Sequence, residues 1–400
     1  MTPILAQRPH APTVPRRKEG ERLPPPSGRM YATPRPLMRR HYLVRSNKAL
    51  AFLSATDTVL RIFAAGCTAA HPPNEPRRIL VANWAHIGDV LTSLPTLRAL
   101  REKFPSATID MIVSRAGRVA AEQSGLCDHL HTIDHFVLNR SNRPRLSKLR
   151  VYLEDRRRFL RAAARQGYDV AIDLYPYFPP AAPLFRQAGI PVRCGFTSGG
   201  YGPLLTHPVT WTYQDKPIGQ YGHDLIAAVW PDWIGPTRWL PPHRPRLTVS
   251  PSSDDGFPIE TPYIVVHVGT GASYREWPEA NWIRLVNLWG SQAPLLVFCG
   301  KGAEEGARAR RIADHAGHGR AMIFLDREWD ELTSLLAGAA GLVCLESSAG
   351  HLAAAFSLPT VAIYSGTNEH RLWGPDNVNA RVLSAPTGCA PCHRGCDAMA

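Results

Sequence analysis

The sequence contains no apolar stretch long enough to cross a lipid bilayer. A membrane-spanning helix needs about 18 consecutive apolar residues, and no run of that length occurs among the 400 residues. The first residues also carry charges and prolines where a secretory signal peptide would have its apolar segment. We therefore expect a protein that neither spans a membrane nor is secreted by these routes.

Cysteines with the spacing of a disulfide framework are also absent. Five of the eight cysteines stand alone in apolar or mixed segments, namely Cys67, Cys127, Cys194, Cys299 and Cys344. Isolated cysteines are typical of proteins that fold in a reducing compartment. The cysteine usage therefore favours a cytoplasmic location.

A cluster of potential metal ligands stands near the end of the sequence. The segment CAPCHRGC contains three thiols and an imidazole, from Cys389, Cys392, His393 and Cys396. Such groups can bind zinc, but no second CxxC pair accompanies them, so the paired spacing of most zinc sites is not met. We expect neither a metal nor a cofactor, and metal binding by this cluster is the minority interpretation.

Signatures of nucleic-acid binding, such as zinc fingers, homeodomains or aromatic RNA-binding motifs, are missing as well. The formal charge of +13 is unevenly distributed, because the first 50 residues carry eleven Lys or Arg against two Glu. The remaining residues hold a net charge of only about +4, which is ordinary for a globular enzyme. We therefore expect no nucleic-acid partner.

The N-terminal region is rich in proline and basic residues. Residues 1–36 contain nine prolines and few large apolar side chains, so they cannot bury enough surface to order themselves. We expect a disordered basic Pro-rich arm over residues 1–48, followed by an amphipathic helix and connector over 49–76. Leu50, Leu53 and Ile62 are among the apolar residues expected on one face of this helix, with Asp57 and Arg61 opposite.

Two interpretations of this helix remain open. A basic arm followed by an amphipathic helix is typical of contact with a membrane surface. Amphipathic helices more often pack against the body of their own protein. We favour packing against the body.

From residue 78 onward, short apolar runs alternate with amphipathic stretches. This alternation is typical of a doubly wound α/β domain, which we place at residues 77–245. The strands expected there cover 79–84, 107–114, 169–174 and 191–196, and helices are expected over 90–103 and 149–166. A Pro-, Ser- and charge-rich stretch over 241–260 has the composition of a linker between domains.

The same alternation restarts after this linker, and we place a second domain at residues 246–400. Strands are expected over 263–269, 294–300, 321–326, 341–346 and 359–366. Strands of this composition joined by helices indicate parallel sheets covered on both faces. The fold class is therefore α/β, with two Rossmann-like doubly wound parallel-sheet domains.

A glycine and a carboxylate follow the first expected strand directly. In the segment HIGDVLTSLP, Gly88 and Asp89 follow His86 and lie where the next helix is expected to begin. Ligands bind at this edge of such sheets, and a glycine allows close approach. Aspartate is also a preferred N-cap, so for the motif alone the capping interpretation is favoured.

A glycine-rich loop follows the first strand of the second domain. Gly269, Thr270 and Gly271 offer backbone N–H groups to a phosphate, and Arg275 adds a cation. The loop matches neither GxGxxG nor the Walker motif, which argues against dinucleotide and NTPase functions.

A second turn of small residues follows the strand expected over 341–346. Glu346 ends this strand, and Ser347, Ser348, Ala349 and Gly350 lead into a helix that contains His351. The N–H groups of such a turn favour an anion. Glu346 is suited to a ribose or sugar hydroxyl, whereas His351 is suited either to a phosphate or to a structural role.

The order and spacing of these motifs over residues 78–396 resemble glycosyltransferase family 9, the bacterial heptosyltransferase family of lipopolysaccharide core synthesis. The matching segments are the GD-xxx-x-P opening, which includes Pro95, the H-x-G-x-G-xxx-[KR]-x-WP segment that starts at His267, and the helix with a carboxylate five residues before H-LAAA. Three positions differ from the usual family pattern. Glu346 replaces Asp, Ser348 replaces Gly, and Arg275 replaces Lys.

The resemblance implies a GT-B fold, with the two domains facing across a cleft, and an enzyme that transfers a sugar from a nucleoside diphosphate without a metal and with inversion. Asp89 matches the family's general base, and His86 and Gly88 lie on the acceptor side. The implied donor site comprises His267, Gly269, Thr270, Gly271, Arg275, Glu346, Ser347, Ser348, Ala349, Gly350 and His351. The implied acceptor is a glycan or lipid-linked glycan of the cell envelope, which suits the inner face of the inner membrane. The identity of the donor sugar stays open.

A dense run of basic residues precedes residue 166, and two interpretations of it remain. In the family this region belongs to the domain that receives the acceptor, but a solvated helix face explains the run at least as well. The basic residues are Arg140, Arg143, Arg145, Lys148, Arg150, Arg156, Arg157, Arg158, Arg161 and Arg165. The alternatives for the whole chain are a nucleotide-sugar epimerase of the same fold and a non-catalytic nucleotide-sugar-binding protein.

Overall fold

The computed structural model describes residues 38–44, 46–64, 70–233, 261–290, 294–317 and 319–385, all within one compact unit, Pro34–Ala400. Most of the expected disordered arm, the expected linker over 241–260 and the cysteine cluster at 389–396 lie outside these residues. Residues 38–43 of the expected arm form a short antiparallel pair, β1 (Met38–Arg39) with β2 (Tyr42–Leu43). The described chain thus begins earlier than expected, because Tyr42, Leu43 and Val44 are buried.

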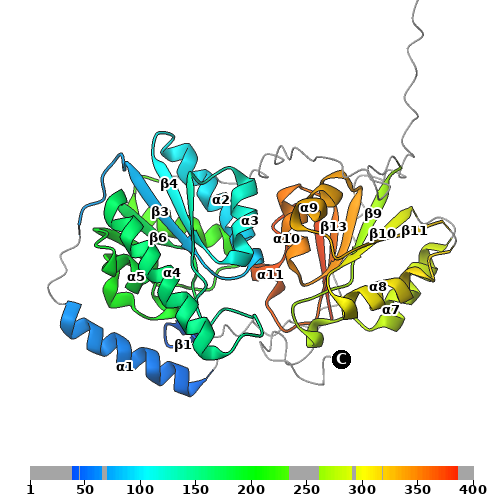
Figure 1. Ribbon diagram of the computed structural model, residues 1–400, viewed down its shortest axis with the longest axis horizontal. Helices are drawn as coiled ribbons and strands as arrows, with labels where there is room; N and C mark the ends of the chain where they lie inside the picture. The colour runs from blue at the N-terminus through cyan, green and yellow to red at the C-terminus, as the bar shows by residue number, and fades with distance from the viewer. Residues whose placement is uncertain are drawn as a thin grey trace, which may run out of the picture. The chain divides into compact units, whose positions relative to one another are not determined.

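The first sheet has six parallel strands in the order β5-β4-β3-β6-β7-β8 (Figure 1). The central strand β3 is almost wholly buried, as expected for a parallel sheet covered on both faces. The chain builds outward from β3 through β4 to β5 and then restarts on the other side of β3 with β6. The strands are β3 (Arg78–Asn83), β4 (Thr108–Val113), β5 (His129–Thr132), β6 (Val170–Asp173), β7 (Val192–Phe196) and β8 (His207–Val209).

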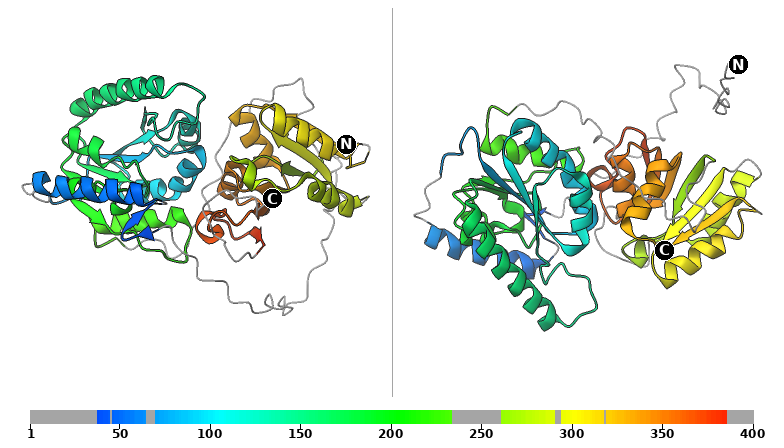
Figure 2. Two further views of the ribbon diagram at one scale, coloured as in Figure 1. Left: turned by 90° about the horizontal axis from the view of Figure 1, so that it is seen from below. Right: turned by 45° about the horizontal axis from the view of Figure 1, so that its top comes forward.

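Helices cover both faces of this sheet (Figures 1 and 2). Side chains of α2, α3 and α6 pack with Ile79 and Val81 on one face, while those of α4 and α5 pack with Leu80 and Ala82 on the other. Alternate residues of β3 thus serve two separate apolar layers. The helices are α2 (Ile87–Lys103), α3 (Arg115–Ser124), α4 (Arg145–Gln166), α5 (Ala182–Gln187) and α6 (Gly222–Val229).

The second sheet repeats this plan in the order β11-β10-β9-β12-β13-β14, again with parallel neighbours. Val265 packs with α9 and α10 on one face, and Val266 packs with α7 and α8 on the other. The strands are β9 (Tyr263–His267), β10 (Leu295–Gly300), β11 (Ala321–Leu325), β12 (Gly341–Leu345), β13 (Thr360–Tyr364) and β14 (Ala380–Ser384). The helices are α7 (Glu279–Trp289), α8 (Ala303–Ala313), α9 (Trp329–Gly338), α10 (Ser348–Ala355) and α11 (His370–Trp373).

Each sheet has a topological switch point where the strand order reverses, between β3 and β6 in the first sheet and between β9 and β12 in the second. In open α/β sheets ligands bind beyond the carboxyl ends of the strands at this point. The loops that follow these four strands are therefore where the fold places a site.

The expected strands of both domains are confirmed, but three edge strands were missed. They are β5, β8 and β14. These strands carry partly exposed side chains and include histidine, proline or charged residues, so they lack the continuous apolar run of a buried parallel strand.

Helix α1 (Asn47–Ala64) packs against the body of the first half, as favoured from the sequence. Leu53 and Asp57 are both buried on the side of α1 that contacts the body. The Tyr42 hydroxyl and the Tyr201 backbone N–H donate hydrogen bonds to the Asp57 carboxylate at 2.9 and 2.6 Å. The expected orientation was wrong in part, because Asp57 points inward while Ile62 is exposed. The two hydrogen bonds make burial of the Asp57 carboxylate tolerable. No helix in the described ranges has the length and apolar content needed to cross a bilayer.

Candidate active site

Asp89 belongs to the first turn of α2, directly after the central strand β3. The N-cap of this helix is His86, and Asp89 is the third helical residue. Its Oδ2 atom accepts the backbone N–H of His86 at 3.0 Å, as in the returning arm of a capping box. Asp89 is therefore not the N-cap residue that the capping interpretation expected. Its carboxylate nevertheless stabilises the start of the helix by accepting a backbone N–H.

Asp89 is partly buried in the cavity wall, and the loss of solvent around its carboxylate raises its pKa to about 6. The hydrogen bond from His86 and the positive charge of Arg140 oppose this rise, since both stabilise the ionised form. The Asn83 side chain fixes the start of the helix by donating to the Asp89 carbonyl at 2.9 Å. A carboxylate with a pKa near 6 is suited to accept a proton close to neutral pH.

The glycine-rich loop follows β9, the strand on one side of the second switch point. The Thr270 hydroxyl donates to the backbone carbonyl of Glu346 at 3.0 Å, which joins this loop to the turn after β12. The Glu305 carboxylate lies close over Gly269, in the position that a β-carbon at this residue would take.

The turn after β12 places a carboxylate against the cation of the glycine-rich loop. Glu346 accepts from Arg275 Nη1 at 3.1 Å and from the Asn368 side chain. Burial raises the pKa of Glu346, while Arg275 and Asn368 hold it down. Three buried polar atoms here, Arg275 Nε, Glu346 Oε2 and Ser347 Oγ, have no partner among the described residues. Buried polar groups are usually hydrogen-bonded, so these three atoms are suited to bond a polar ligand.

These elements line one cavity of about 540 Å³, so the structure brings together residues that are far apart in the sequence. From the first half, His86, Gly88 and Asp89 contribute. The second half contributes His267, Thr270, Gly271, Arg275, Glu346, Ser347, Ser348 and His351. Three expected residues do not line this cavity: Gly269 lies beneath Glu305, and Ala349 and Gly350 are buried on the core side of α10.

The cavity also contains residues that the motifs did not single out. They are Arg140, Tyr175, Tyr177, Glu305, Asn368 and Trp373. Tyr175 and Tyr177 follow β6, which pairs with β3 at the first switch point. Their position beyond the end of this strand could have identified them from the sequence as candidates for ligand binding. The ring of Tyr177 stacks against that of Trp373 with centroids 6.0 Å apart, a contact between distant segments that the sequence did not indicate.

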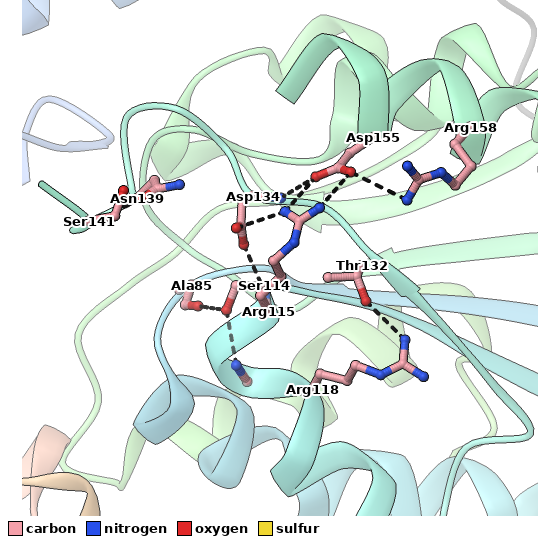
Figure 3. Close-up of polar contacts among 11 residues, drawn as sticks. Ala85, Ser114, Arg115, Arg118, Thr132, Asp134, Asn139, Ser141, Asp155 and Arg158 are labelled. Carbon is pink, nitrogen blue, oxygen red and sulfur yellow. Dashed lines mark hydrogen bonds and ion pairs between the residues drawn. The ribbon is translucent and has the colours of Figure 1, made fainter. Parts of the chain in front are cut away.

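Arg140 lies in the loop between β5 and α4, and the residues on either side of it are held in place. Asn139 accepts the Ser141 backbone N–H on its side chain at 2.9 Å (Figure 3) and the Lys148 ammonium on its carbonyl at 2.9 Å. The Arg140 guanidinium reaches the glycine-rich loop, because a β-carbon added at Gly271 would stand 3.3 Å from its Nη1 atom. Part of the basic run is thus not simply a solvated face.

An ion-pair network around the buried Asp155 carboxylate anchors the same region (Figure 3). Arg115, the first residue of α3, donates two hydrogen bonds to Asp155 in α4, at 2.8 and 2.9 Å, and a third to Asp134 at 2.8 Å. Only 1% of the Asp155 side chain is exposed. The network ties α3 to α4 and to Asp134, and so fixes both ends of the segment that carries Arg140.

The two cavity histidines next to Asp89 are neutral near pH 7. Burial lowers the pKa of His351 to about 4, and burial together with the positive charge of Arg140 lowers that of His86 to about 4. The positive potential of the cavity therefore comes from Arg140, Arg275 and the N-terminus of α10, not from imidazolium groups.

Metal ligands are not grouped in the part of the chain that the structure describes, where no three His, Cys, Asp or Glu side chains lie close enough to hold an ion. The cluster of Cys389, Cys392 and Cys396 lies outside that part. Cys194, Cys299 and Cys344 are buried as free thiols, and burial raises the pKa of the Cys344 thiol to about 12.

Comparison with known proteins gives a consistent result. The sequence model of glycosyltransferase family 9 (heptosyltransferase) matches residues 156–400. Lipopolysaccharide heptosyltransferase 1 of Salmonella typhimurium is 24% identical over 313 residues, which are 74% of this chain and 91% of the relative. The Pseudomonas aeruginosa enzyme of the same name is 26% identical, over 79% of this chain and 86% of its own.

Solved structures show the same fold. The Escherichia coli heptosyltransferase WaaC with ADP superposes with a TM-score of 0.63 at 20% identity, covering 77% of this chain and 93% of that one. The Escherichia coli ADP-heptose lipopolysaccharide heptosyltransferase II gives 0.61 at 21% identity, covering 78% and 91%. The expected GT-B fold of two Rossmann-like domains is confirmed.

Proposed function

This chain belongs to glycosyltransferase family 9 and is a glycosyltransferase, and from this premise we propose that it transfers a sugar from a nucleoside diphosphate to a hydroxyl of a cell-envelope glycan. The observation that carries the proposal is the shared cavity, which Asp89 lines together with Gly271, Arg275 and His351. A proton acceptor on one side and groups that stabilise an anion on the other are what glycosyl transfer requires.

We assign donor binding to the second half, residues 246–400. The N–H groups of Thr270 and Gly271 and the N-terminus of α10 offer hydrogen bonds to a diphosphate. Arg275 is suited to a charge-assisted bond, because its Nε atom is buried without a partner among the described residues. The carboxylates of Glu305 and Glu346, both in the cavity wall, are suited to accept hydrogen bonds from hydroxyls of the ribose or of the donor sugar.

We assign the acceptor to the first half, residues 77–245, with Asp89 as the general base. Asp89 takes the proton of the acceptor hydroxyl while the hydroxyl oxygen bonds to the anomeric carbon of the donor sugar. The bond between that carbon and the diphosphate oxygen breaks at the same time. Attack by the acceptor from the side opposite the leaving group inverts the anomeric centre in a single step. The raised pKa of Asp89 supports this role, since a stronger base accepts the proton more readily.

The leaving diphosphate gains negative charge as the bond breaks, and we propose that the chain's own groups stabilise it without a metal ion. Arg275 and the N-terminus of α10 face it from the second half. Arg140 approaches the glycine-rich loop from the first half. Because both histidines beside Asp89 are neutral, these guanidinium groups are the cations that the cavity wall provides.

The relatives supply the first candidates for the substrates. One Escherichia coli relative was solved with ADP-2-deoxy-2-fluoro heptose, and the curated relatives are named lipopolysaccharide heptosyltransferases. We therefore propose an ADP-activated heptose, or another activated sugar, as donor and the lipopolysaccharide core as acceptor, at the cytoplasmic face of the inner membrane.

A donor screen followed by product analysis tests the proposal. Thermal unfolding with ADP-, GDP- and UDP-sugars identifies the donor, because a bound nucleotide raises the melting temperature by mass action. The donor is then incubated with and without a core oligosaccharide. We expect nucleoside diphosphate and a longer oligosaccharide only when both substrates are present. A changed sugar from donor alone would indicate an epimerase, and binding without turnover would indicate a non-catalytic protein.

A further inference from the structure

Helix α1 exposes a row of apolar side chains to solvent. Phe52, Val59 and Ile62 are 54%, 52% and 71% exposed, and with the exposed Ala55 they follow the spacing i, i+3, i+7, i+10 of a single helical stripe. We call these four residues the α1 stripe. Figure 2 (left) shows α1 in front of the first half, with no other drawn helix or strand outside it.

The stripe is not a by-product of a loosely attached helix. The opposite face is fixed by Leu53, which is 1% exposed, and by the Asp57 carboxylate with its two hydrogen bonds. Leu53 packs against Gly200 so closely that a β-carbon there would stand 2.8 Å from it. Helix α1 is therefore a firmly packed element that keeps several large apolar groups in water, at a free-energy cost that a binding surface would explain.

The exposed Lys, Arg, Asp and Glu side chains of α1 and of the strand pair before it are all basic. Arg39, Arg40, Lys48 and Arg61 are exposed on or beside α1, while Asp57, the one acidic residue of the helix, is buried. The first 50 residues carry eleven Lys or Arg against two Glu. An apolar stripe flanked by cations is complementary to an anionic lipid surface, which attracts each nearby Lys or Arg and accepts apolar side chains between its headgroups.

We propose that the α1 stripe docks the enzyme onto an anionic lipid monolayer. The surface fits a lipid better than a protein partner, because a stable protein interface uses about 20–30 residues a side, whereas the stripe is one residue wide. The Phe52 ring also contacts Phe178, with centroids 6.0 Å apart in an edge-on arrangement. Phe178 belongs to the loop whose Tyr175 and Tyr177 line the active-site cavity, so docking through α1 holds that wall close to the lipid.

Sedimentation with vesicles tests the proposal, using the full chain without donor or acceptor so that the result is independent of sugar transfer. Vesicles of phosphatidylcholine alone are compared with vesicles that also contain phosphatidylglycerol. We expect binding to the anionic vesicles that weakens as salt is added, since the attraction of the cations is screened. The double variant Val59→Ser, Ile62→Ser should bind at least about tenfold more weakly, because two apolar side chains no longer enter the lipid.

The matched control is the double variant Leu288→Ser, Val378→Ser, which removes two apolar side chains that are each 75% exposed in the second half. It should bind vesicles like the unchanged chain. Both double variants should keep the same melting temperature within a few degrees, because all four side chains are exposed. Equal vesicle binding by the two double variants, or no preference for anionic lipid, would overturn the proposal. So would self-association that the α1 changes abolish, since the stripe would then join two copies of the chain.

Discussion

The His351 ring in α10 lies directly against Gly88 in α2, so that a β-carbon added at Gly88 would stand 3.3 Å from the His351 Cδ2 atom. Gly88 follows a strand of the first sheet and His351 follows a strand of the second. Each lies next to residues with a role in the proposed reaction. Gly88 precedes the proposed base, and His351 follows the turn that carries Glu346 and Ser347. The contact therefore sets the distance between the base and the donor pocket.

Enlarging Gly88 should slow transfer without unfolding the protein. Gly88→Val forces α2 and α10 apart, and a displacement of about 1 Å between reacting groups costs up to about 100-fold in rate. We expect kcat to fall at least about tenfold, with a smaller loss for Gly88→Ala. Steady-state kinetics measures both. A Gly88→Val enzyme with unchanged kcat would mean that this contact does not position the base.

Removing the charge of Asp89 should abolish most of the transfer and leave donor binding intact. Asp89→Asn cannot accept the hydroxyl proton, and general-base catalysis contributes about 10²–10⁴-fold. The amide oxygen can still accept the His86 N–H, so the helix start should survive. Nucleotide affinity, measured by calorimetry, should change by less than about threefold. Asp110→Asn, at a buried carboxylate outside the cavity, is the control and should remain active; an active Asp89→Asn enzyme would rule out the assignment of the base.

The pH dependence of kcat/KM should show one acidic limb near pH 6. The raised pKa of Asp89 means that the active, ionised form is lost as the pH falls through about 6, and the rate then drops about tenfold per pH unit. His86 and His351 remain neutral in this range and add no second limb there. Arg140→Gln should move the limb to higher pH, because Arg140 lowers the pKa of Asp89. A shift to lower pH would contradict the assigned interaction.

Arg275 should matter for donor affinity in a way that depends on Glu346. In Arg275→Ala the buried Glu346 carboxylate loses its cation and then repels a diphosphate, so nucleotide affinity should fall at least about tenfold. Adding Glu346→Gln should restore part of the loss, because the repulsion is removed. Arg275→Lys should lose less than Arg275→Ala. A double-mutant cycle by calorimetry measures the coupling, and strictly additive losses would argue against the Arg275–Glu346 pair as a unit.

Loss of Arg115 should destabilise the first half. Arg115→Met leaves the Asp155 carboxylate buried with weaker partners, at 3.3 Å from the Asp134 N–H and 3.6 Å from Arg158. Breaking a buried pair costs about 3–5 kcal/mol, and because Arg115 is half exposed we expect the lower end of that range. Arg118→Met is the matched control. Its guanidinium, equally exposed, pairs with the exposed Glu122, and such surface pairs are worth about 0–1 kcal/mol. Urea unfolding of both variants decides the point.

The central strands and the motif residues of the site could be predicted from the sequence. Continuous apolar runs mark buried strands such as β3 and β9, and ligands gather at the ends of such strands. The edge strand β14 alternates charged and apolar side chains, a pattern that gave too little signal. The motif residues Asp89, Gly271 and Glu346 could be found because each lies within a few residues of the end of a strand at a switch point.

The tertiary partners of these residues could not be predicted. Arg140 and Trp373 enter the cavity from segments that share no motif with it, and only the packing of the chain brings them there. The orientation of α1 was partly missed for a similar reason. A buried aspartate is unfavourable unless partners satisfy it, and the partners of Asp57 come from Tyr42 and from Tyr201, which is 144 residues away.

The division of the cavity wall between two sheets has an evolutionary consequence. His86, Gly88, Asp89 and the tyrosines come from one sheet, while Arg275, Glu346 and Ser347 come from the other. Under the proposed assignment, substitutions in the first wall away from Arg140 and Gly88 change the surroundings of the acceptor and leave Arg275, Glu346 and Ser347 unchanged. If the two halves bind different substrates as proposed, a hybrid that joins the first half of one family member to the second half of another should take its acceptor preference from the first and its donor preference from the second.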